Sequence, residues 1–145
     1  MNPTFVSNKG ISLVKRFEGL HKVKEDGTVR AYRCPAGKWT IGYGHCKAVK
    51  SGMLASVEDC ERFLQDDLND AGAVIKRHVH VPLSQEQFDA LASFVFNIGG
   101  GKPFQNSTLL KKLNQGLYDE VPEQILRWNK ARVEGVLTTL AGLTK

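Results

Sequence analysis

The chain has 145 residues, of which 41% are hydrophobic and 24% are charged, and its formal net charge is +5. This length suits one domain, or a two-lobed unit with a long connecting helix, and the ordinary composition excludes a disordered protein. No stretch approaches the roughly 18 apolar residues of a membrane span, and the basic charge favours a polyanionic partner such as nucleic acid or the bacterial envelope.

The first predicted element is a helix capped by Ser7 and stopped by Gly19. Its apolar positions recur at helical spacing: Ile11, Leu13, Val14, Phe17 and Leu20. Glu18 therefore lies in the last turn, where the helix dipole disfavours a carboxylate and raises its pKa. A raised pKa suits a general acid, although a surface glutamate fits the same pattern.

A small β lobe is expected next, over about residues 18–55. The pair Asp26–Gly27 stands between alternating residues and predicts a hairpin, and residues 38–43 alternate again as a third strand. Pro35 to Gly37 supply the turn between them. We therefore predict an antiparallel meander of about three strands.

The rest of the chain has helical periodicity. Ser56 predicts the cap of a connecting helix over about residues 56–76, and Ser84 with Gln87 forms a capping box for the next helix. Glycines 99–101 end that helix, a short helix around Leu109 to Leu113 follows, and another runs from Pro122 to Trp128.

Metal and cofactor chemistry has little support in the sequence. His78 and His80 form the only close histidine pair, and no cysteine or acid stands at ligand spacing around them. Glycine-rich nucleotide motifs and a Ser-His-Asp pattern are absent as well. We predict no metal and no cofactor.

Three cysteines, Cys34, Cys46 and Cys60, are an odd number in a chain long enough to need no cross-link. They predict free thiols in a protein made in the cytosol, and no secretory signal is visible at the N-terminus. A disulfide between Cys34 and Cys46 is an alternative hypothesis, because both lie close to the predicted hairpin.

Several short motifs carry a resemblance to a known family. They stand in order along the chain, at Phe17–Gly19, Ala31–Arg33, Trp39–His45, Asp89–Gly99 and Phe104–Leu110. Together they resemble the phage-type lysozymes, the endolysins of glycoside hydrolase family 24, over roughly residues 7 to 130. The resemblance implies one α+β, lysozyme-like domain over residues 1–145. In it, the small antiparallel lobe (about 18–55) and the larger helical lobe (about 77–145 plus the N-terminal helix) are joined by the long helix, with a cleft between them.

The resemblance also implies catalytic roles. Glu18 matches the acid that protonates the glycosidic oxygen, and Thr40 matches a threonine that assists the attacking water. A carboxylate is usual six residues before this threonine, but this chain has Cys34, which the family also tolerates. Three interpretations stay open: Cys34 as a base for water, Cys34 as a nucleophile, or Cys34 as a positioning residue only.

Other site residues follow from the same resemblance. His45 matches a structural histidine paired with an acid on the connecting helix, for which Asp66 is the first choice and Asp67 the second. The predicted saccharide contacts are Gly44, Cys46, Phe96 and Ser107. Cys34 follows Glu18 by sixteen residues, more than is usual in the family, and we expect the Asp26–Gly27 hairpin to absorb the difference.

The predicted function is hydrolysis of the β-1,4 bond between N-acetylmuramic acid and N-acetylglucosamine in peptidoglycan, which lyses the bacterial host. The alternatives are a lytic transglycosylase that uses Glu18 alone and a non-catalytic basic module that binds wall or nucleic acid. Scattered basic residues and the absence of a helix-turn-helix motif argue against nucleic acid. The resemblance implies a monomer that waits in the host cytoplasm until a holin releases it.

Overall fold

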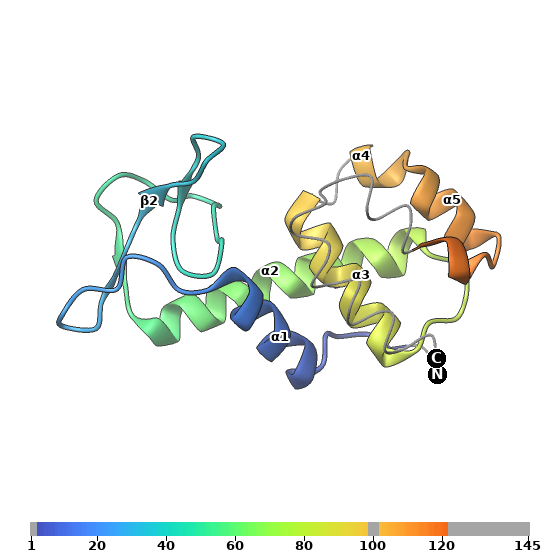
Figure 1. Ribbon diagram of the computed structural model, residues 1–145, viewed down its shortest axis with the longest axis horizontal. Coiled ribbons are helices and arrows are strands. Elements are labelled where there is room, and N and C mark those ends of the chain that lie inside the picture. Colours follow the sequence, from blue (N-terminus) through green and yellow to red (C-terminus); the bar gives the residue numbers. More distant parts are fainter. Residues whose placement is uncertain (1–2, 99–101, 122–145) are drawn as a thin grey trace. The chain divides into compact units, whose positions relative to one another are not determined.

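The computed structural model describes residues 3–98 and 102–121, and Figure 1 shows their helices and strands. The described residues pack as two compact units, one formed by residues 11–67 and the other by residues 3–10, 68–98 and 102–121. Both helices and antiparallel strands are present, so the predicted α+β class is confirmed. The helix predicted from Pro122 to Trp128 lies outside the described residues.

Helix α1 (Asn8–Glu18) begins and ends where its caps predict. The Ser7 hydroxyl accepts a hydrogen bond from the Gly10 N–H at 3.1 Å, which satisfies a donor that the helix leaves unpaired. At the other end, Gly19 has a φ of 70°, a conformation that glycine adopts without strain. These two caps leave Glu18 as the last helical residue.

The strands of unit 11–67 are short and pair differently from the predicted meander. They are β1 (Val29–Arg30), β2 (Tyr32–Arg33), β3 (Trp39–Thr40) and β4 (Leu54–Ala55). The hairpin β2–β3 is as predicted, but β1 pairs with β4. The Asp26–Gly27 hairpin forms only an isolated bridge, Val23–Val29, with backbone hydrogen bonds from Lys24 to Thr28 and from Arg30 to Lys22. The Ala31 N–H donates to the Met53 carbonyl at 2.9 Å, so a distant segment takes the edge that the meander required.

A tight loop follows β3. Ile41 and His45 exchange two backbone hydrogen bonds, of 2.8 and 3.0 Å, and close the glycine-rich turn between them. Gly42 has a φ of 67°, and a Cβ atom on it would lie 2.8 Å from the Cβ and Sγ atoms of Cys60. Only glycine therefore lets this loop approach the buried Cys60 of the long helix.

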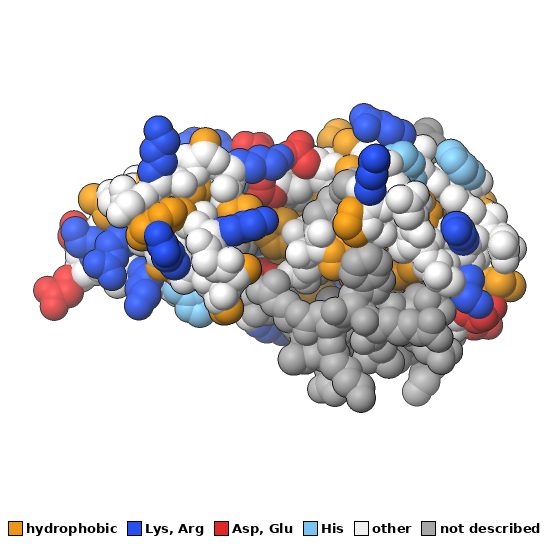
Figure 2. All heavy atoms as spheres, turned by 90° about the horizontal axis from the view of Figure 1, so that it is seen from above, with side chains coloured by type: hydrophobic (Ala, Val, Ile, Leu, Met, Phe, Trp, Pro, Cys, Tyr) orange, Lys and Arg blue, Asp and Glu red, His pale blue; other side chains and the backbone are white. Residues whose placement is uncertain are grey.

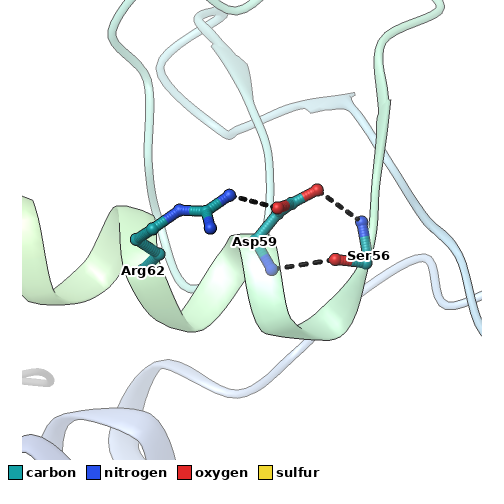
Figure 3. A network of polar contacts seen from close by, with 3 residues as sticks. All are labelled: Ser56, Asp59 and Arg62. Atoms are coloured by element: carbon teal, nitrogen blue, oxygen red, sulfur yellow. Dashed lines mark hydrogen bonds and ion pairs between the residues drawn. The ribbon is translucent and has the colours of Figure 1, made fainter.

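That long helix, α2 (Val57–His78), starts at a capping box. The Asp59 N–H donates to the Ser56 hydroxyl at 2.9 Å, and the Ser56 N–H donates to the Asp59 carboxylate at 3.3 Å (Figure 3). Arg62 forms an ion pair with the same carboxylate one turn later. The cap is the predicted one, and the helix continues two residues beyond the predicted end.

Replacing Ser56 by alanine is expected to lower the free energy of unfolding by about 1 kcal/mol, because the first turn loses its hydroxyl acceptor. Denaturant unfolding measures the change. Ser51→Ala, at an exposed turn position, is the matched control and should cost less than about 0.5 kcal/mol. Equal losses for both variants would contradict the capping role.

The second unit is helical. Its elements after α2 are α3 (Gln85–Ile98), α4 (Lys102–Gln105), α5 (Thr108–Asn114) and the 3-10 helix η1 (Tyr118–Glu120). Figure 1 shows α4 and α5 following α3 (yellow to orange). The predicted capping box is present, since Ser84 and Gln87 exchange hydrogen bonds of 2.9 and 3.1 Å. The fully buried side chains Phe88, Phe104, Leu109 and Leu113 form its core.

Asp89 of α3 ties the N-terminal segment to this unit. Its carboxylate accepts hydrogen bonds from the Ser7 N–H at 2.9 Å, from the Ser7 hydroxyl, and from the Gln85 amide at 2.8 Å. The same Ser7 hydroxyl caps α1, so one polar cluster fixes where that helix starts.

Over the described ranges, no helix is both long enough and apolar enough to cross a membrane.

Candidate active site

Glu18 stands at the C-terminal end of α1, half-buried, in unit 11–67. The Gly19 N–H donates to the Lys15 carbonyl at 2.9 Å, and a ring nitrogen of His21 lies 3.2 Å from the Glu18 carbonyl oxygen. The chain is therefore held on the carboxyl side of Glu18 by its own backbone and by His21.

The β2–β3 hairpin gathers the other catalytic candidates on one face. Tyr32 pairs with Thr40, and Arg33 pairs with Trp39. Side chains alternate between the two faces of a strand, so Tyr32, Cys34 and Thr40 share a face opposite to Arg33 and Trp39. The register thus brings together two residues that the sequence singled out.

His21 connects this face with the end of α1. Its ring meets the Tyr32 ring edge-on, with 5.7 Å between centroids and 71° between planes, while its nitrogen lies against the Glu18 carbonyl. Sequence reasoning missed His21, because a single histidine in a charged turn belongs to no motif. Its contacts link Glu18 to the strand pair of Thr40.

Cys34 is half-buried at the start of the turn between β2 and β3. The pKa of the thiol is lowered from its ordinary value, chiefly because the Lys38 N–H donates to the sulfur. Burial opposes this effect, and the Ala36 N–H and the Thr40 hydroxyl add smaller effects that lower the pKa further. Donors aimed at one atom favour its anionic form. The turn therefore makes the thiol more acidic than an ordinary cysteine, at the position where the family usually has a carboxylate.

Thr40 is buried, with 5% of its surface exposed. Its hydroxyl donates to the Lys38 carbonyl at 3.1 Å and also acts on the Cys34 thiol. A hydroxyl carries one proton, so Thr40 serves one acceptor at a time, and a thiolate would compete with the carbonyl for it. Thr40 and Cys34 thus form a coupled polar pair.

The acid paired with His45 is Asp67, so the first choice, Asp66, is wrong. His45 Nδ1 lies 2.9 Å from an Asp67 carboxylate oxygen, and both side chains are nearly buried. Successive residues of an α-helix are rotated by about 100°, which leaves Asp66 exposed when Asp67 faces the loop. The His45 ring also stacks on Phe63, with centroids 4.5 Å apart.

Asp67→Ala is expected to lower the free energy of unfolding by about 1–3 kcal/mol, since it removes the partner of a largely buried imidazole. Asp66→Ala changes the neighbouring exposed position and should cost less than about 0.5 kcal/mol. Thermal or denaturant unfolding of both variants measures the difference. The reverse order of stabilities would contradict the assignment of the pair.

The predicted saccharide contacts fall in both units. Gly44 is half-buried and Cys46 exposed in unit 11–67, whereas Phe96 is half-buried and Ser107 buried in the helical unit. The Ser107 hydroxyl donates to the Phe104 carbonyl at 2.7 Å and accepts from the Leu110 N–H at 3.1 Å. Ser107 therefore caps α5, and a role in binding stays a prediction.

The three cysteines all lie in the described part of the chain and are free thiols. Burial raises the pKa of the Cys60 thiol, in contrast to that of Cys34. Within residues 3–98 and 102–121, no three His, Cys, Asp or Glu side chains gather as a metal site would require.

Comparisons with known proteins place the chain in a family. The phage lysozyme family matches residues 15–145. The endolysin of Acyrthosiphon pisum secondary endosymbiont phage 1 is 44% identical over 140 residues, which are 97% of this chain and 90% of the relative. The fold is that of a lysozyme, and the chain belongs to the phage lysozyme family.

Solved structures agree with this assignment. The muramidase domain of SpmX from Asticaccaulis excentricus matches with a TM-score of 0.80 and 31% identity, over 96% of this chain and 97% of the other. The endolysin from Escherichia coli O157:H7 phage FAHEc1 matches with a TM-score of 0.77 and 32% identity, over 92% of this chain and 91% of the other. The protein is thus an enzyme, a lysozyme that hydrolyses peptidoglycan.

Proposed function

We propose that this lysozyme cleaves the β-1,4 bond between N-acetylmuramic acid and N-acetylglucosamine, with Glu18 as general acid and the Cys34 thiolate as general base. The observation that carries the proposal is the set of donors around the Cys34 sulfur, which lowers the pKa of the thiol. A neutral thiol is a poor base, whereas a thiolate can accept a proton from water, and a lowered pKa increases the thiolate fraction at a given pH.

The proposed step balances without a metal or cofactor. Glu18 gives its proton to the glycosidic oxygen as the bond to the anomeric carbon breaks, and a water molecule attacks that carbon from the opposite face. The water proton passes to the Cys34 thiolate, and Thr40 holds the water or the product hydroxyl. The enzyme returns to its starting state when Glu18 regains a proton from solvent and the Cys34 thiol loses one.

A general base at Cys34 gives inversion at the anomeric carbon. Direct attack by the sulfur would instead form a covalent thioglycosyl intermediate and give retention after hydrolysis. The anomer that forms first, followed by nuclear magnetic resonance, separates the two. Inversion is the expected result, and retention would mean that Cys34 acts as a nucleophile and not as a general base.

The proposed setting is a monomer made in the cytoplasm of an infected bacterium and released to the wall by a holin. We further propose Gly44, Cys46, Phe96 and Ser107 as saccharide contacts. Support for the setting comes from the family and from its relatives, which are named endolysins.

A clearing assay tests the proposed function and its setting. Added protein should clear a suspension of Gram-negative cells whose outer membrane has been permeabilised. Expression in intact cells without a holin should leave them unlysed, and coexpression with a holin should lyse them. No clearing of permeabilised cells would overturn the activity, and lysis without a holin would overturn the route of release.

A further inference from the structure

Lysines and arginines occur along the whole chain, but the net positive charge comes from one stretch, residues 21–55, which we call the basic segment. It holds five lysines and two arginines against two acids, Glu25 and Asp26, and so carries +5. The remaining thirteen cations and thirteen acids of the chain cancel. The whole net charge therefore resides in about a quarter of the sequence, within one compact unit.

All seven cations of the basic segment are exposed. They are Lys22, Lys24, Arg30, Arg33, Lys38, Lys47 and Lys50. Figure 2 shows many Lys and Arg side chains over the unit that holds the strands (left). The segment thus presents a positive surface to solvent.

Backbone hydrogen bonds bring two of these cations, Lys22 and Arg30, opposite each other. The Arg30 N–H donates to the Lys22 carbonyl at 3.1 Å, and the next residue, Ala31, donates to Met53 beside the turn that starts at Lys50. Lys22 therefore lies opposite Arg30 on the adjacent segment of the same hairpin. Like charges placed opposite each other destabilise a β pair, and a bound anion would relieve that repulsion.

The type of cation indicates a diffuse attraction. Lysine acts as a mobile point charge, whereas arginine forms the rigid fork that binds a phosphate through two hydrogen bonds. Of the two arginines, Arg33 lies over the Trp39 ring, with 5.4 Å from its guanidinium carbon to the ring centroid. A lysine-rich surface with few arginines fits a flexible polymer with spaced carboxylates better than a single phosphate group.

We propose that the basic segment is a docking surface for the carboxylates of the peptide stems of peptidoglycan. This inference rests on the proposed function and names a second contact with the same substrate. The segment includes the β2–β3 hairpin with Cys34 and Thr40, so a wall strand attracted to it is concentrated beside these residues. The surface raises the local concentration of substrate and takes no part in bond cleavage.

The test neutralises part of the segment. The triple variant Lys22→Gln, Lys24→Gln, Arg30→Gln lowers the net charge from +5 to +2. Its binding to purified sacculi, measured by sedimentation in a Glu18→Gln background, should weaken about tenfold or more in low salt, because electrostatic steering contributes roughly 10–10³-fold. The difference from the parent should vanish near 1 M salt, where the screening length falls to about 3 Å. With Glu18 present, KM should rise and kcat should stay unchanged.

A matched control carries the same loss of charge elsewhere. Arg77→Gln, Lys102→Gln, Lys111→Gln changes three exposed cations of the helical unit and also leaves +2. This variant should bind sacculi within about twofold of the parent, since its three cations belong to the other unit and are not part of the proposed docking surface. An equal loss in both triple variants would overturn the assignment to the basic segment, as would no loss in either.

Chemically modified sacculi identify the anion. Amidation of the stem carboxylates should abolish the advantage of the parent over the basic-segment variant. An advantage that survives amidation but disappears when wall phosphate polymers are stripped would overturn the proposal in favour of a phosphate-rich partner. Binding without hydrolysis by the parent would contradict the proposed function and leave the docking surface supported, so the two failures are distinguishable.

Discussion

Replacing Glu18 by glutamine is expected to lower the rate of wall hydrolysis about a thousandfold, within the range of roughly 10²–10⁴ that general acid catalysis contributes. Glutamine has nearly the same shape but no acidic proton to give to the glycosidic oxygen. The His21 contact uses the backbone carbonyl of residue 18, so the substitution leaves it in place. Release of reducing ends from sacculi measures the rate.

Glu25→Gln provides the control for this change, because Glu25 is an exposed acid of the same unit. Its rate should remain close to that of the parent. Both variants should also unfold at the same denaturant concentration as the parent, which separates chemistry from stability. A Glu18→Gln variant that hydrolyses sacculi as fast as Glu25→Gln would remove Glu18 from the mechanism.

Cys34→Ala is expected to lower kcat about a hundredfold or more, the lower end of the range for loss of a general base. Cys34→Asp should recover most of the rate, because it restores an anion at the same place. Cys34→Ser should not, since a serine hydroxyl stays protonated at neutral pH. Equal rates in the alanine and aspartate variants would mean that the side chain only positions its neighbours.

The pH dependence gives a second check on Cys34. The rate should rise with pH through the pKa of the folded thiol, which the Lys38 and Ala36 N–H groups and the Thr40 hydroxyl hold below the ordinary value. In Cys34→Asp this limb should move to about pH 4, the range of a carboxylate. Because the folded pKa is lowered, the thiolate stabilises the fold fully above the unfolded pKa, and this contribution is lost as pH falls through the folded pKa. A limb unmoved by the substitution would assign the titration to another group.

The helices could be predicted because their start and stop residues act locally. Ser7, Ser56 and Ser84 each cap the helix that follows, through hydrogen bonds to residues three positions on. The strand pairing could not be predicted in the same way. The partner of Val29 is Ala55, twenty-six residues away, and no turn motif joins the two.

The sequence motifs of the candidate site could be predicted, but the contacts between its residues could not. The motif Trp39–His45 indicates the loop that the bridge from Ile41 to His45 closes. Asp66 and Asp67 point in directions about 100° apart around the helix axis. An error of one residue in the match to the family therefore selects the wrong acid. His21 was not predicted, because its place in the site depends on a contact with the Tyr32 ring that only the folded chain creates.

The most direct test of the proposed mechanism is the chemistry of the ends that the enzyme leaves on purified peptidoglycan. Digestion in water enriched in heavy oxygen, followed by mass spectrometry, identifies the sugar at each new end and the source of its oxygen. The account predicts reducing ends of N-acetylmuramic acid that carry one oxygen from the water. Anhydro-muramic ends without that oxygen, as a transglycosylase leaves, or reducing ends of N-acetylglucosamine, would contradict it.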